Sequence, residues 1–204
     1  SDSVKWEDAA LVEPFAIGSH CTGRGRVVED DVVFILGTGT IGSIILQTCK
    51  AKGCKTVICC DISDSSLERA KEYGADYVIN SKTQDVVAEI QKITDGHGCT
   101  VAFDSACFPG SLTMCLQPGI LCNAGRMVPM GFCTEKEGIT QAMINQRELD
   151  IIGSRMSQDA FEPTIARMEK GEYITEGIAT TFIKFSEIDK VFHLMDHPDE
   201  SAKK

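Results

Sequence analysis

Three glycines early in the chain have the spacing of a phosphate-binding turn. Residues 37–42 read GTGTIG, follow the apolar run VVFIL and open a stretch of helical period. In such a strand–turn–helix, Gly37 would allow a tight turn, Gly39 would let a pyrophosphate approach the backbone, and Gly42 would let helix and strand pack closely. Unpaired N–H groups at the helix start would then bind the anion. The predicted cofactor-binding turn consists of Gly37, Thr38, Gly39, Thr40, Ile41 and Gly42.

An acidic residue supplies the second half of this fingerprint. The next apolar run, TVICCD, ends at Asp61, about 20 residues beyond the glycine turn. A carboxylate at that place accepts hydrogen bonds from the adenosine ribose hydroxyls and repels the additional phosphate of NADP. Ile62 and Ser63 follow, so no basic residue stands beside the acid. The two halves predict an NAD site that includes Asp61 and Ile62. The alternative is a capping or surface aspartate behind a purely structural turn.

The elements that would position this site alternate along the chain. Short β-branched runs such as VVFIL, TVICC, DYVIN and TVAF are each followed by a stretch of helical period, and later segments GRMVPMGF and LDIIGS also predict strands. Runs that are apolar on both faces are typical of buried parallel strands. The pattern predicts an α/β, doubly wound parallel sheet, the Rossmann fold. We expect one NAD-binding domain over residues 1–204, with a lead-in helix in 1–30 and a C-terminal helix and truncated tail in 186–204.

Composition limits the partners. The chain has 20 Lys and Arg against 30 Asp and Glu, a formal net charge of −10, so neither nucleic acid nor an anionic membrane is expected to bind. No stretch approaches the roughly 20 apolar residues of a membrane span, and the first residues do not have the profile of a signal peptide. A cytoplasmic protein is therefore expected.

The ten cysteines are predicted to be mostly reduced core residues, because most of them stand in apolar runs. No pair has C-x-x-C spacing, and the four histidines are scattered along the sequence. We therefore expect no complete metal site within this chain.

Together, these segments resemble a known family. The stretches EPFAIGSHCTGRGRV, GTGTIG, DISDSSLERAKEYGADYVIN, ITDGHG, VAFD and GRMVPMGF are similar, in order and spacing, to landmarks of the zinc-dependent medium-chain dehydrogenases. The sorbitol, threonine and sugar-acid branch is the most similar. The resemblance extends from Ala9 to His197 and implies a subunit with two domains, one carrying zinc and the other NAD. This chain would be the excised cofactor domain, inactive alone, with zinc only in the missing catalytic domain.

The resemblance also implies roles for residues outside the turn. Glu13, before Pro14, would lie beside the catalytic zinc; the alternative is a glutamate at a helix entry with proline at the first helical position. Met130 and Gly131 would hold the nicotinamide carboxamide, although a strand ending in a turn glycine is an equal alternative. Ser105 would contact the adenine side.

Ser154 and Arg155 are similar to a loop that reaches the nicotinamide end or the substrate. Arg155 could pair with a carboxylate on the substrate or with a surface acid such as Asp159, and the sequence leaves both open. There are also departures: Ser66 stands where many relatives have an arginine that stacks on adenine, and Cys107 stands where relatives often have glycine.

Our first hypothesis is the NAD-binding domain of a zinc-dependent dehydrogenase that oxidises a secondary alcohol of a polyol or sugar acid. A nucleotide-sensing or structural Rossmann module without catalysis is the alternative from another class. A zinc-independent quinone reductase-like domain is less consistent with Asp61 and with the Glu13–Pro14 stretch. The resemblance further implies a homodimer joined through the edge strand in RELDIIGS.

Overall fold

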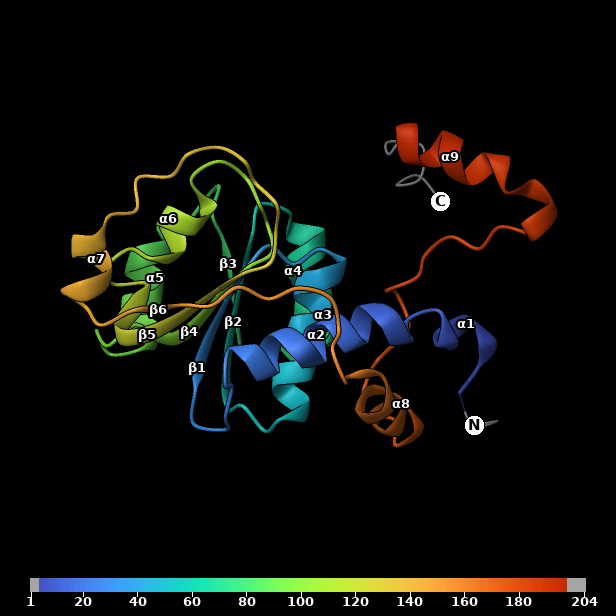
Figure 1. Cartoon of the computed structure of the whole chain (residues 1–204), viewed down its shortest axis with the longest axis horizontal. Coiled ribbons are helices and arrows are strands. Elements are labelled where there is room, and N and C mark those ends of the chain that lie inside the picture. The colour runs from blue at the N-terminus through green and yellow to red at the C-terminus, as the bar shows by residue number, and fades with distance from the viewer. Residues whose placement is uncertain (1–3, 198–204) are drawn as a thin grey trace. The chain divides into compact units, whose positions relative to one another are not determined.

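A computed structural model describes residues 4–197, which divide into two compact units with the boundary between Ile174 and Thr175. The larger unit holds a single sheet of six parallel strands in the order β3-β2-β1-β4-β5-β6 (Figure 1). This is the strand order of the Rossmann fold, and it confirms the predicted fold class. The strands are β1 (Val32–Leu36), β2 (Thr56–Asp61), β3 (Tyr77–Asn80), β4 (Cys99–Asp104), β5 (Leu121–Pro129) and β6 (Asp150–Ile151).

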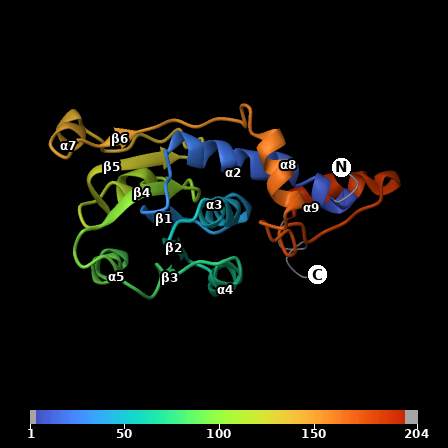
Figure 2. The ribbon, with the colours of Figure 1, turned by 90° about the horizontal axis from the view of Figure 1, so that it is seen from below.

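Helices cover both faces of the sheet. α2, α3 and α4 lie on one face and α5 on the other, while α8 crosses α2 on its outer side (Figure 2). The helices of this unit are α1 (Trp6–Ala9), α2 (Val12–Arg24), α3 (Thr40–Ala51), α4 (Asp64–Glu72), α5 (Val86–Ile93), α6 (Ser111–Cys115), α7 (Gln141–Asn145) and α8 (Phe161–Glu169).

Alternation along the central strands supplies both halves of the core. In β1, Phe34 and Leu36 belong to the cluster that packs with Ile90 of α5, whereas Val33 and Ile35 are fully buried outside that cluster. Successive side chains of a strand point to opposite faces, so a run of apolar residues fills both layers at once. The ten cysteines are free thiols, and seven of them are buried.

The observed elements differ from the predicted ones mainly at the ends. The predicted strand LDIIGS forms β6 over only two residues, and the strand predicted from GRMVPMGF begins earlier, at Leu121, and ends at Pro129. Ser63 caps α4, because its hydroxyl accepts a hydrogen bond from the Ser66 amide. The predicted lead-in region contains α1 and α2. Residues 198–204 of the predicted tail lie outside the described residues.

The order of the strands also locates the place where a ligand can enter. β1 is flanked by β2 on one side and β4 on the other, so the connections leaving β1 and β4 run to opposite faces of the sheet. In open parallel sheets a crevice forms at this switch point, outside the carboxyl ends of the strands. The glycine turn follows β1 directly and therefore lies at the crevice.

A buried ionic network joins the opposite, amino-terminal side of the sheet. The Asp31 carboxylate, 5% exposed, forms an ion pair with Arg126 of β5 and accepts hydrogen bonds from Thr100 of β4 and the Val28 amide. The Arg126 guanidinium also donates to the carbonyl oxygens of Gly25 and Arg26. The network thus fixes the loop after α2 against β4 and β5.

The smaller unit begins at Thr175 and contains the 3-10 helix η1 (Phe185–Glu187) and α9 (Asp189–Asp196). Its large apolar side chains are mostly exposed, including Phe185 at 87% and Met195 at 72%. Between residues 4 and 197, no helix is both long and apolar enough to cross a membrane.

We expect Arg126→Met to lower the free energy of unfolding by about 3–5 kcal/mol, because it leaves the Asp31 carboxylate buried without its cation. Urea unfolding followed by circular dichroism measures the change. Lys55→Met is the matched control, since Lys55 pairs with Asp30 on the open surface and such pairs contribute little. Equal shifts of the urea midpoint in the two variants would contradict the importance of the buried network.

Candidate functional site

The glycine turn begins with a residue in the left-handed region. Gly37 has a φ of +87°, which side chains rarely tolerate, and its amide donates to the carbonyl oxygen of Cys60 at 2.7 Å. A β-carbon at this position would lie 2.8 Å from the amide nitrogen of Ala106. Glycine is therefore required by the backbone of the loop after β4 as well as by the turn itself.

The other two glycines have different physical reasons. A β-carbon on Gly42 would lie 1.9 Å from the Gly37 carbonyl oxygen and 2.8 Å from the hydroxyl oxygen of Ser105, so only glycine lets α3 start this close to β1. A β-carbon on Gly39 would meet nothing within 4 Å. Because the protein itself does not fill the space beside Gly39, this glycine leaves room for another molecule.

The start of α3 faces the same space. Gly39 precedes the helix as its N-cap, with φ −64° and ψ −166°, and both Gly39 and Thr40 are exposed. The first N–H groups of an α-helix have no partner within the helix. α3 is 12 residues long with no acidic residue in its first turn, so the positive end of its dipole is not neutralised there. The turn can therefore bind an anionic group.

Asp61 is tied to the turn by hydrogen bonds. Its Oδ2 accepts from the Thr38 amide at 2.7 Å and from the Thr38 hydroxyl at 2.9 Å. Its Oδ1 accepts from the amides of Ile62 at 2.7 Å and Ser63 at 2.9 Å. The predicted acid thus lies beside the glycine turn with its carboxylate held in one orientation. Ile62 follows it with a side chain that is 57% exposed.

Ser105 supports the turn from the β4 side. Its hydroxyl donates to the carbonyl oxygens of Gly37 at 2.7 Å and Leu36 at 3.0 Å, and its amide donates to Leu36 at 2.9 Å. The structure therefore brings the turn, Asp61 and Ser105 into one hydrogen-bonded group. In this group the Ser105 hydroxyl bonds to the protein backbone.

Sequence reasoning missed the part played by Asp104. This aspartate, 4% exposed, ends β4, and its Oδ1 accepts from the amides of Ala106 and Cys107 while its Oδ2 accepts from the Ser111 hydroxyl. It therefore fixes the loop that follows β4, and its carbonyl oxygen accepts from the Met130 amide at 2.9 Å. Its place at the end of a central strand, like that of Asp61, was the signal that could have identified it.

Cys107 and Gly131 join the loops that follow β4 and β5. A β-carbon on Gly131 would lie 1.6 Å from the Cys107 sulfur, so the thiol occupies the room that glycine leaves. Cys107 has a φ of +55°, a conformation that glycine adopts with less strain. Burial raises the pKa of this thiol, with smaller contributions from Asp104 and Cys133. These residues line a cavity of about 270 Å³.

Glu137 holds the segment after β5 against the start of α6. Its carboxylate accepts from the Thr113 amide and hydroxyl, both at 2.6 Å, and from the amides of Gly110 and Leu112 at longer distances. Burial raises the pKa of this carboxyl group, but the hydrogen bonds from Thr113, Gly110 and Leu112 outweigh burial, and the pKa is lowered. The carboxylate is thus the favoured form.

Ser154 and Arg155 follow β6 beside the end of β5. The Arg155 guanidinium lies over the ring of Phe132, 5.0 Å from its centroid, and Phe132 directly follows Gly131. The Ser154 hydroxyl is buried and has no hydrogen-bond partner in the described structure. The structure therefore brings these predicted residues to the same side of the sheet as Met130 and Gly131.

Glu13 is not connected to this group by any hydrogen bond or ion pair of the described residues. It is exposed in the first turn of α2, next to Pro14. Among residues 4–197, no three His, Cys, Asp or Glu side chains are grouped so that they could hold a metal ion.

We expect Gly42→Ala to lower the free energy of unfolding by about 1–3 kcal/mol or more, because the new methyl group overlaps the Gly37 carbonyl oxygen. Gly39→Ala adds the same methyl group to open space at an allowed φ, and should leave the free energy unchanged or raise it by up to about 1 kcal/mol. Urea unfolding of the two variants tests this. Similar stability of both would show that the close approach of α3 to β1 is not a constraint.

Comparisons with known proteins identify relatives of this chain. Residues 40–170 match the sequence profile of a family described as zinc-binding dehydrogenase. Starvation-sensing protein RspB of Escherichia coli K12 is 33% identical over 205 residues, covering 100% of this chain and 59% of the relative. Sorbitol dehydrogenase of Bacillus subtilis is 31% identical over 181 residues, covering 88% of this chain and 49% of the relative.

A solved structure has the same fold. The crystal structure of an alcohol dehydrogenase (rspB) from Escherichia coli CFT073, in complex with NADH, matches with a TM-score of 0.87 and 32% identity, over 96% of this chain and 57% of that one. The chain thus spans about half the length of the relatives that it matches.

Proposed function

The chain belongs to the zinc-binding dehydrogenase family, and we propose that it is the part of an oxidoreductase that binds NAD and positions the nicotinamide ring. The observation that carries this proposal is the open space beside Gly39, at the start of α3 and next to the fixed carboxylate of Asp61. NAD, when bound, supplies the acceptor for a hydride. The similar RspB structure holds NADH, which supports the choice of cofactor.

Each group at the turn has a distinct role in this proposal. The amides at the start of α3 bind the pyrophosphate, and Gly39 lets it come close enough to be bound. Asp61 accepts the ribose hydroxyls, for which the Thr38 hydroxyl, a rotatable donor, can make room. The negative charge of Asp61 repels a 2′-phosphate, so NAD is preferred over NADP. Ile62 and Ser105 border the adenosine.

The loops after β5 and β6 are proposed to receive the nicotinamide. Met130 and Gly131 offer backbone groups to the carboxamide, while Asp104 keeps Met130 in place through the Met130 amide. Ser154 and Arg155 approach from the next strand. The described residues do not fit a zinc site, and we propose that the remainder of a longer protein holds the zinc. Glu13 is proposed to face that remainder.

For the longer protein we propose oxidation of a secondary alcohol on a small molecule of the polyol or sugar-acid type. The family, and the sorbitol dehydrogenase among the relatives, support this assignment. A nucleotide-sensing module is the alternative. The coding sequence upstream of Ser1 discriminates the two: a segment with zinc-ligand residues supports the enzyme, and a start codon at Ser1 would contradict it.

Calorimetric titration of the chain with NAD+ and NADP+ tests the cofactor assignment. We expect NAD+ to bind at least about tenfold more tightly than NADP+, a difference of about 1.4 kcal/mol. Asp61→Asn keeps the shape but removes the charge, and should weaken NAD+ binding about 10- to 150-fold while reducing the discrimination against NADP+. Gly39→Ala should weaken both cofactors. Tight NADP+ binding without a preference for NAD+ would overturn the role of Asp61.

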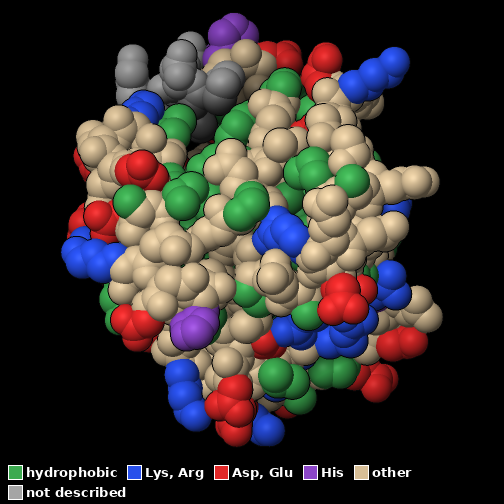
Figure 3. Space-filling model, turned by 90° about the vertical axis from the view of Figure 1, so that its left-hand side faces the viewer, with side chains coloured by type: hydrophobic (Ala, Val, Ile, Leu, Met, Phe, Trp, Pro, Cys, Tyr) green, Lys and Arg blue, Asp and Glu red, His purple; other side chains and the backbone are tan. Residues whose placement is uncertain are grey.

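We also infer that two copies pair along β6. This strand is bonded only to β5 among the described strands, and Ile151 is 36% exposed. Figure 3 shows the side of the molecule that carries α7, where apolar side chains are interspersed in the middle and charged ones lie mostly toward the rim. The Ile152 amide bonds to Met127 of β5, so the Ile151 amide points away from the sheet and is available to a second copy.

Light scattering of the chain over a range of concentrations tests the pairing. We expect a dimer that Ile151→Pro converts into a monomer with an unchanged circular dichroism spectrum, because proline removes only the outward-pointing donor. Ile152→Pro, which removes the bond to β5, should instead destabilise the fold. A wild-type monomer at high concentration, or a dimer that survives Ile151→Pro, would contradict pairing through β6.

A further inference from the structure

Arg155 is an exposed arginine that forms neither a hydrogen bond nor an ion pair with any residue between 4 and 197. The sequence had left Asp159 open as its partner, but no ion pair joins the two side chains. Within the described part of the chain, the Arg155 guanidinium contacts the ring of Phe132. Its five N–H donors are therefore available in a chain that carries an excess of ten acidic residues.

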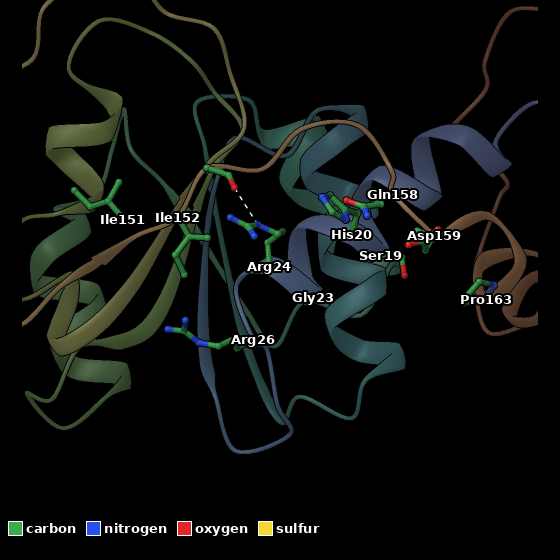
Figure 4. Close-up of a pocket in the computed structure, with 12 residues that line it drawn as sticks. Ser19, His20, Gly23, Arg24, Arg26, Ile151, Ile152, Gln158, Asp159 and Pro163 are labelled. Atoms are coloured by element: carbon green, nitrogen blue, oxygen red, sulfur yellow. Dashed lines mark hydrogen bonds between the residues drawn. The ribbon is translucent and has the colours of Figure 1, made fainter.

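The backbone that presents Arg155 is well anchored. Arg126 and Met127 of β5 are in register with Asp150 and Ile151 of β6, and beyond these strands the Arg155 guanidinium lies over the ring of Phe132, the residue after Gly131. The Gly153 carbonyl accepts a hydrogen bond from Arg24 of α2 at 3.1 Å, which Figure 4 shows across the hollow between α2 and the segment after β6. Arg155 thus lies beyond the carboxyl end of the sheet, beside the loop assigned to the nicotinamide.

Phe132 determines how the guanidinium can bind a ligand. The ring lies 5.0 Å from the Arg155 carbon atom Cζ and covers one face of the planar group. Such a contact orients the cation without using its N–H groups. The edge of the guanidinium remains free, and two parallel N–H groups on this edge match the two oxygens of a carboxylate. A neutral polyol offers no group that would compensate the charge.

We propose that Arg155 determines substrate specificity and that the substrate is a hydroxy acid whose carboxylate binds its guanidinium, rather than a neutral polyol. This rests on the proposed function, because it assumes that hydride transfer takes place beside Gly131. It also explains why a cation stands unpaired here. A surface with a net charge of −10 repels an anionic substrate on average, so a local cation is needed to hold one.

The test compares acids with the matching alcohols on the complete enzyme containing its zinc domain. The probes are aldonates of four to six carbons and the corresponding alditols, for example D-gluconate and sorbitol. We expect the highest kcat/KM for an aldonate, and a loss of about 10- to 100-fold with Arg155→Met, mainly through a higher KM. Calorimetric binding of the same compounds to the enzyme–NADH complex gives the comparison independently of turnover.

Three variants make the result specific. Arg155→Lys keeps the charge but not the paired donors and should recover only part of the affinity. Phe132→Leu removes the oriented contact and should raise the KM for the aldonate less than Arg155→Met does. Lys92→Met removes an exposed charge from α5 and should change neither substrate's kinetics.

The outcomes separate this proposal from the proposed function. The carboxylate assignment would be overturned if an alditol were the best substrate and Arg155→Met did not change the ratio of kcat/KM for the aldonate to that for the alditol. NAD+ binding by the chain would in that case still support the cofactor site. If Arg155→Met lost affinity for NAD+, Arg155 would be shown to bind the dinucleotide, and the carboxylate assignment would also be overturned. Failure of the wild-type chain to bind NAD+ would instead contradict the proposed function.

Discussion

The contact between the start of α3 and the end of β1 is the constraint on which the rest of the site depends. A side chain on Gly42 would overlap the carbonyl oxygen of Gly37, so the helix can begin directly over the strand only because residue 42 has none. This contact directs the amide groups of α3 toward the switch point of the sheet. Asp61 and Ser105 reach the turn from the strands on either side of β1 and bond to its backbone.

The site is divided between rigid and adaptable parts. The turn, Asp61 and Asp104 are fixed by hydrogen bonds that already exist in the protein, so little conformational freedom is lost when a ligand binds there. The other end is built from loops after β5 and β6, where Phe132 and Arg155 are exposed and contact each other. Differences in substrate can be accommodated in these exposed loops, because the glycine turn is held by its own hydrogen bonds to Asp61 and Ser105.

The sequence was sufficient for the sheet and the turn because those features depend on local pattern. Apolar runs and glycine spacing are readable directly, and the alternation of strands with helices indicates a parallel sheet. The place of Asp104 at the end of a central strand is readable from the sequence. Its bonding partners, the contacts of Glu137 and the Cys107–Gly131 contact could not be predicted, since the fold alone brings these groups together. For the same reason, the sequence could not decide between Asp159 and an external carboxylate as the partner of Arg155, or see that Phe132 orients it.

In the proposed function, the amides at the start of α3 bind the pyrophosphate of NAD. Two-dimensional ¹H–¹⁵N NMR of the labelled chain during titration with NAD+ tests it most directly. We expect saturable shifts that are largest at the amides of Gly39, Thr40 and Ile41, with smaller ones at Ile62 and Gly131. Saturable binding that leaves the Gly39–Ile41 amides unchanged, or shifts them less than distant amides, would contradict it.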